Sequence, residues 1–181
     1  MKQTFVIPII VLTAICLVVS GALAVMDYFT SPIILAADAE RAAEAMTAKI
    51  PHATGFEQID FEGHDEIPKS IKEVYKTTNN VGYIFIASAN GFSGAITVIC
   101  AIDIDGRIIA TSTLSHTETV GIGTIIEQES FLSPFSGLDM NLHGIDTVTG
   151  ATISTKAYIG IIRDIFEAHS IFVKYSTVEQ K

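Results

Sequence analysis

The sequence predicts an α+β fold: an antiparallel sheet flanked by helices, preceded by a single transmembrane helix. Three observations predict it. Residues 4–26 contain no charged side chain, short apolar runs alternate with turn signals in the middle of the chain, and apolar residues recur at helical spacing near its end. We expect a membrane anchor at residues 1–27, a connecting helix at 28–50 and one folded domain at 51–181, since 181 residues suffice for both units.

The anchor prediction rests on the apolar segment 4–26. At 1.5 Å per residue it forms about 35 Å of helix, enough to cross a bilayer core of about 30 Å. The alternative is a cleavable signal peptide, because Ala22-Leu23-Ala24 has the small-x-small form of a cleavage site. Lys2 precedes the segment and Asp27 follows it. The positive-inside rule therefore predicts a single-pass protein of the cell (inner) membrane, with its domain on the extracytoplasmic side.

The next segment predicts the connecting helix and a loop. Ser31-Pro32 has the pattern of an N-cap followed by proline at the first helical position. The Ala-rich run 33–49 carries apolar residues on one face and stops before Pro51. Residues 52–69 are polar, with Gly and Pro, and predict a loop containing short strand pieces.

Residues 71–116 form the strand-rich part. Three apolar runs there predict neighbouring strands: residues 81–87, 95–104 and 107–114. The turn signals Asn90-Gly91 and Asp105-Gly106 separate these runs and predict an antiparallel meander. The second run is almost wholly apolar, which indicates a buried central strand. Residues 121–145 contain proline and several Gly and Ser residues, and predict a long loop of the kind that is uncommon unless functional.

Composition excludes several classes of function. The chain has 20 acidic and 11 basic residues, so it lacks the basic footprint of a nucleic-acid-binding protein. Cys16 falls in the apolar N-terminal segment and Cys100 in a predicted strand, which argues against a disulfide between them. No group of Cys and His has metal-ligand spacing, so we expect no metal site. No Gly-x-Gly-x-x-Gly follows a strand, so we expect no NAD site.

One polar stretch stands directly before the C-terminal helical pattern at residues 158–166: Asp146-Thr147-Val148-Thr149-Gly150-Ala151-Thr152. Thr152 is therefore expected at or just outside a helix N-terminus, where unpaired N–H groups and the helix dipole favour an anion. Gly150 allows the backbone to turn and approach a ligand. The alternative is purely structural, with Ser154 or Thr155 as the N-cap.

The same stretch resembles the flavinylation motif Asp-x-x-Ser/Thr-Gly-Ala-Thr of the FMN-binding domain family. The positions that match the motif are Asp146, Thr149, Gly150, Ala151 and Thr152. The resemblance implies that Thr152 carries FMN through a phosphoester bond, which a dedicated flavin transferase would form. The other matched residues would then belong to the cofactor-binding site.

A second stretch is His116-Thr117-Glu118-Thr119-Val120-Gly121-Ile122-Gly123. It resembles His-x-Glu-Thr-Pro-Gly-Leu-Gly of the same family, with Val120 and Ile122 as departures. The matched residues, which the resemblance assigns to cofactor binding, are His116, Glu118, Thr119, Gly121 and Gly123. Its glycines would let the backbone pass close to a flat ring, and its polar side chains could bond the edge of that ring. The alternative is a polar strand end followed by a glycine-hinged loop.

The resemblance extends over residues 82–168 and makes residues 51–181 the expected FMN-binding domain. An anchored single domain of this length resembles the G subunits of Rnf-type complexes. That implies an electron-transfer subunit of a translocase rather than a complete enzyme, with no catalytic residue of its own. Its partners would be the other membrane subunits of ferredoxin:NAD electron transport coupled to Na⁺ or H⁺ translocation. The alternatives are an extracytoplasmic FMN domain that feeds another respiratory reductase and a cofactor-free anchored structural domain.

Overall fold

The computed structural model describes residues 7–26, 28, 30, 55–61, 66–79 and 81–178, with side chains to residue 174. The chain divides into two compact units, Met1–Glu40 and Arg41–Lys181. In the first unit, Ile7–Met26 is a helix long and apolar enough to cross a membrane, by length and composition. This confirms the predicted N-terminal apolar helix. The predicted connecting helix at residues 33–49 lies outside the described residues.

The second unit is built on a five-stranded antiparallel sheet in which the strands follow one another in sequence order. The strands are β1 (Phe56–Gln58), β2 (Ile71–Thr77), β3 (Gly82–Asn90), β4 (Ala95–Asp103) and β5 (Ile108–His116). The predicted antiparallel meander is confirmed, including the two turns at residues 90–91 and 105–106. Strand β3 is the central strand, and β4 is an interior strand beside it. Both cysteines are free, as predicted.

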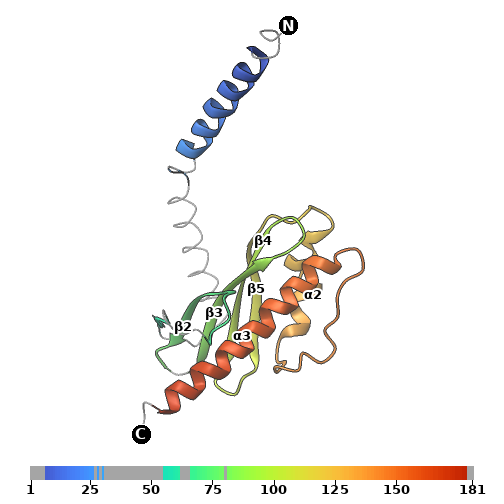
Figure 1. The fold of residues 1–181 in the computed structure, drawn as a ribbon. Coiled ribbons are helices and arrows are strands. Elements are labelled where there is room, and N and C mark those ends of the chain that lie inside the picture. The colour runs from blue at the N-terminus through green and yellow to red at the C-terminus, as the bar shows by residue number, and fades with distance from the viewer. Residues whose placement is uncertain are drawn as a thin grey trace. The chain divides into compact units, whose positions relative to one another are not determined.

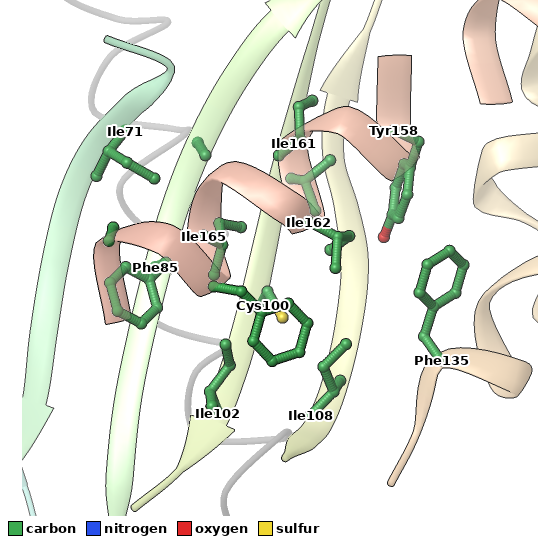
Figure 2. Packing of buried hydrophobic residues seen from close by; sticks show 14 of the residues in the cluster. Ile71, Phe85, Cys100, Ile102, Ile108, Phe135, Tyr158, Ile161, Ile162 and Ile165 are labelled. Carbon is green, nitrogen blue, oxygen red and sulfur yellow. The ribbon is translucent and has the colours of Figure 1, made fainter. Parts of the chain in front are cut away.

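Helix α3 (Thr152–Val178) lies along one face of the sheet and covers it (Figure 1). Alternate residues of β4 point to opposite faces, as the period of a strand requires. Cys100 and Ile102 face α3, whereas Ile99 belongs to a smaller buried cluster on the other face. Figure 2 shows these strand side chains packed against Ile161, Ile162 and Ile165 of α3. The helix begins at Thr152, so the predicted helical run 158–166 is only its central part.

The long loop predicted at residues 121–145 contains short helices, so its prediction as a loop without secondary structure is corrected. These helices are η1 (Gly123–Glu127), α2 (Glu129–Leu132) and η2 (Ser133–Phe135). Phe131 and Phe135 lie four residues apart, and their rings approach that of Tyr158 with centroid distances of 5.3 and 5.6 Å. Tertiary burial of these aromatic side chains against α3 explains why a segment rich in turn formers is ordered.

Candidate functional site

Three loops of the second unit enclose one cavity of about 330 Å³. The first is the β3–β4 turn at residues 91–94, the second follows β5, and the third precedes α3. The cavity is lined by Phe92, Glu118, Thr119, Ile122, Gly123, Gly150, Ala151, Thr152, Ile153 and Ser154. It therefore brings together the two stretches that the sequence singled out, together with the turn between β3 and β4.

The third loop is a tight turn at residues 148–151. The Ala151 N–H donates to the Val148 carbonyl at 3.0 Å, and Gly150 has a φ of 89°. A positive φ at this third turn position suits glycine, because a Cβ disfavours it. Thr155 fastens the turn: its hydroxyl accepts from the Val148 N–H at 3.2 Å and donates to the Ala151 carbonyl at 2.9 Å. The turn therefore delivers Thr152 as the first residue of α3.

The structural alternative for Ser154 and Thr155 is not what the structure shows. The Ala151 carbonyl accepts the Thr155 N–H at 2.9 Å, so Ala151 occupies the N-cap position. Both hydroxyl residues lie inside the first turn and are buried. Thr152, by contrast, is exposed and lines the cavity. Among the described residues, none hydrogen-bonds the Thr152 hydroxyl, so this oxygen is available for chemistry.

Glu118 forms the polar floor of the cavity and is only 6% exposed. Its carboxylate accepts from the Ser93 N–H at 3.0 Å and from the Ser154 hydroxyl. Burial raises the pKa of Glu118, but hydrogen bonds from Ser154 and from three backbone N–H groups of the 91–94 turn outweigh it and hold the pKa below its usual value. The carboxylate is therefore charged at neutral pH.

Glycines make room for this carboxylate. A Cβ on Gly91 would lie 2.4 Å from Glu118 Oε1, and a Cβ on Gly123 would lie 2.7 Å from Glu118 Oε2. These glycines are therefore needed for packing around Glu118. Gly121 differs, because its Cβ would meet nothing within 4 Å. Its φ of 80° explains the glycine there through backbone conformation.

The remaining predicted residues lie mostly around the cavity rather than in its lining. The His116 Nδ1 accepts from the Glu118 N–H at 3.0 Å, and its Nε2 lies 3.0 Å from a Glu127 oxygen, so His116 braces the backbone of Glu118. Thr119 lines the cavity, and its hydroxyl hydrogen-bonds Ser93 at 3.1 Å. Thr149 is exposed outside the lining. Asp146 also lies outside it and contributes to a separate hollow of about 180 Å³.

Sequence reasoning missed the apolar rim of the cavity. Phe92, Ile122 and Ile153 line it and are 68, 56 and 54% exposed. They come from three different loops, so no periodic pattern in the sequence connects them. The one available signal was an aromatic residue within a Gly-Phe-Ser-Gly turn, where a polar residue would be expected. Together with Glu118, this rim makes a site that suits a flat, largely apolar ligand.

Comparison with known proteins defines the class. Residues 91–167 match the FMN-binding domain family, and all three loops of the cavity fall within that range. The predicted resemblance to this family is therefore confirmed. The fold is also that of a solved structure, NqrC from Shewanella oneidensis, with a TM-score of 0.54 at 15% identity. That alignment covers 73% of this chain and 87% of the solved one.

Two curated relatives narrow the resemblance, and both are G subunits of membrane complexes. One belongs to the proton-translocating ferredoxin:NAD(+) oxidoreductase complex of Clostridium ljungdahlii; this chain is 26% identical to it over 171 residues, covering 89% of both chains. The other belongs to the ion-translocating oxidoreductase complex of Vibrio vulnificus. This chain is 26% identical to it over 172 residues, covering 82% of this chain and 81% of that one. The chain thus resembles these proteins over most of its length.

The residues present fit FMN. The cavity offers apolar side chains for a flat ring and, at its mouth, one exposed hydroxyl on the first turn of a helix. The first N–H groups of that turn have no partner within the helix and favour a phosphate. Bound FMN would supply one- and two-electron chemistry, and the protein would supply binding and orientation.

Proposed function

We propose that this chain is a membrane-anchored electron-transfer subunit of an ion-translocating oxidoreductase, and that it carries FMN as a phosphoester on Thr152. The observation that carries the proposal is the position of Thr152. Its exposed hydroxyl starts α3 at the mouth of an apolar-rimmed cavity, inside the segment that matches the FMN-binding domain family. The names of the relatives support the assignment to an ion-translocating complex.

The charge of the cavity supports covalent attachment. Among the described residues that line it, Glu118 is the one charged side chain, and it is negative. No Lys or Arg of that lining offsets the negative charge of a phosphate. A flavin phosphate held only by non-covalent contacts would therefore be repelled by Glu118 and attracted only by the helix N-terminus. A bond to Thr152 removes this disadvantage, because the flavin can no longer dissociate.

The attachment step joins Thr152 Oγ1 to the phosphorus of the flavin phosphate. The hydroxyl gives up its proton, and the phosphorus gives up the leaving group of an activated flavin phosphate, which a flavin transferase supplies. The 148–151 turn holds Thr152 in position for this step through the hydrogen bonds of Thr155. Asp146 and Thr149 lie close to the acceptor in the chain and outside the cavity lining, where the transferase can contact them.

The proposed setting is a membrane complex. Helix Ile7–Met26 would anchor the chain, and Lys2 on one side with Asp27 on the other favours an extracytoplasmic domain. The relatives are subunits of complexes, so the partners would be other subunits of an Rnf-type complex. Within it the chain would relay electrons, and the complex as a whole would perform the reaction.

The test is covalent flavin in a denaturing gel, read by its fluorescence under ultraviolet light after co-expression with a flavin transferase. The wild-type band should fluoresce, and Thr152→Ala should be dark because it lacks the acceptor oxygen. Asp146→Ala should be intermediate, and Thr149→Ala should be close to wild type. Circular dichroism controls for folding in each variant.

The variant Thr152→Ser is the matched control, because it keeps an acceptor hydroxyl at the same backbone position. It should retain some covalent flavin. A fluorescent Thr152→Ala band would assign the acceptor elsewhere. A wild-type band that stays dark and has the unmodified mass would favour the cofactor-free structural domain.

A further inference from the structure

We propose that Glu118 is a fixed negative charge that lowers the reduction potential of the flavin held in this cavity. The inference rests on the proposed function, because it requires FMN in the cavity. It goes further by assigning Glu118 an electrostatic role in setting the potential, in addition to its contacts with the surrounding loops.

The first step is the position of the carboxylate. Glu118 follows β5 and lies at the floor of the cavity, which the apolar rim also lines. It is joined to the first turn of α3 through the Ser154 hydroxyl and to the β3–β4 turn through the Ser93 N–H. The first turn of α3 also carries the acceptor Thr152. A flavin attached there and lying against the rim is therefore close to the carboxylate.

The second step is that the charge persists. The turn at residues 91–94 and Ser154 supply hydrogen-bond donors that stabilise the ionised carboxylate. The described residues give it no Lys, Arg or His partner, since the His116 Nδ1 contacts the backbone N–H of Glu118 and not its carboxylate. The helix N-terminus adds only about half a positive charge. A net negative potential therefore remains at the cavity floor.

The third step is the effect of that potential on a flavin. Reduction adds negative charge to the ring, so a nearby fixed anion disfavours the reduced form relative to the oxidised form. The apolar side chains of Phe92, Ile122 and Ile153 would exclude water when a ring lies against them. Exclusion of water lowers the local dielectric constant and strengthens the interaction. Such a flavin is a stronger reductant than it would be in water.

A purely structural role for Glu118 predicts something different. Its hydrogen bonds join the 91–94 turn to α3, so a variant that breaks them would lower stability or flavin loading. It would not move the potential of the flavin that is loaded. The reduction potential is therefore the measurement that separates the two roles.

The experiment is a spectroelectrochemical titration of full-length, covalently loaded protein in detergent. In Glu118→Gln the shape is kept and the charge is removed, so the potential should rise. At a fixed ambient potential the ratio of oxidised to reduced flavin should fall about tenfold or more. Glu118→Asp keeps the charge and should remain near wild type. Glu129→Gln removes an exposed charge outside the cavity lining and should leave the potential unchanged.

An unchanged potential in loaded Glu118→Gln would overturn the inference while leaving the proposed function intact. If Glu118→Gln acquires no flavin, Ser154→Ala decides the question. It removes a donor that screens the carboxylate and leaves the charge in place, so the potential should fall. A potential that stays constant or rises in Ser154→Ala would also overturn the inference. The absence of covalent flavin from the wild-type protein would instead contradict the proposed function.

Discussion

Two buried ionisable side chains lie toward opposite ends of α3, and the protein treats them differently. Glu118 meets the first turn of the helix and is 6% exposed, whereas His169 belongs to the later part of the helix and is 7% exposed. Glu118 is surrounded by hydrogen-bond donors from a loop and from the helix. His169 lies against the rings of Tyr83 and Phe85, with centroid distances of 5.5 and 6.2 Å, and among the described residues its Nε2 has no hydrogen-bond partner.

The difference shows what decides whether a buried group keeps its charge. Desolvation lowers the pKa of His169, and a hydrogen bond to the Asp103 backbone offsets this only in part, so the ring is neutral. For Glu118 the donors outweigh desolvation, so the carboxylate is ionised. The exposed fractions of the two side chains are nearly equal. The polar groups of the neighbouring segments, not the degree of burial, therefore set the charge.

Apolar replacement of each group tests this comparison most strongly. Glu118→Leu leaves the donors of the 91–94 turn and Ser154 without their acceptor, so the free energy of unfolding should fall by about 3 kcal/mol. His169→Phe replaces a neutral ring by another ring of similar size in an aromatic environment, and should cost less than about 1.5 kcal/mol. Urea unfolding of the full-length protein in detergent, followed by circular dichroism, measures both. Equal losses would mean that the two environments are equivalent.

Crowding the carboxylate should have the next largest effect. Gly91→Ala places a Cβ 2.4 Å from Glu118 Oε1 and 2.5 Å from the Ile96 side chain. Either the carboxylate or the turn must move, at a cost of about 2 kcal/mol. Covalent flavin loading should fall as well, because the cavity floor is displaced. Gly160→Ala is the matched control: it lies in α3 with nothing within 4 Å of its Cβ, so it should be neutral or slightly stabilising.

The fold was largely predictable because its signals are local. The turn residues at 90–91 and 105–106 and the apolar runs between them indicated the strand order, and a helix N-terminus was expected at or beside Thr152. The short helices at residues 123–135 were not predicted. Their stability comes from aromatic packing against Tyr158, a contact between segments distant in sequence.

The candidate site was predictable only in part, for the same reason. The resemblance identified Thr152 and Glu118 as site residues, but it gave no partner for Glu118. That partner set joins Ser93 and Ser154, which are 25 and 36 residues away from Glu118. No sequence period relates such positions. Gly123 was expected to let the backbone approach a ring, whereas the structure shows that the space beside it is filled by Glu118.

His169 should make stability depend on pH. Its folded-state pKa is lowered, so below the unfolded pKa of about 6.5 the unfolded chain binds more protons than the folded one. The stabilisation is complete above that value and is lost as the pH falls toward the folded pKa, by at most about 1.4 kcal/mol per pH unit. Unfolding free energies of wild type and His169→Phe between about pH 5 and 8 measure the difference. Parallel curves for the two proteins would show that His169 does not cause the dependence.

The smallest expected effect separates the two kinds of glycine near the site. Gly121 has a φ of 80° and open space around its Cβ position, and it does not line the cavity. Gly121→Val should therefore lower the free energy of unfolding by about 1 kcal/mol through backbone strain alone, with little change in flavin loading or absorbance. Gly121→Asn should cost less, because asparagine tolerates a positive φ. If both variants fold normally but load little flavin, Gly121 must contact the ring or the transferase. That outcome would place it with Gly91 and Gly123 as a glycine required for space rather than for conformation.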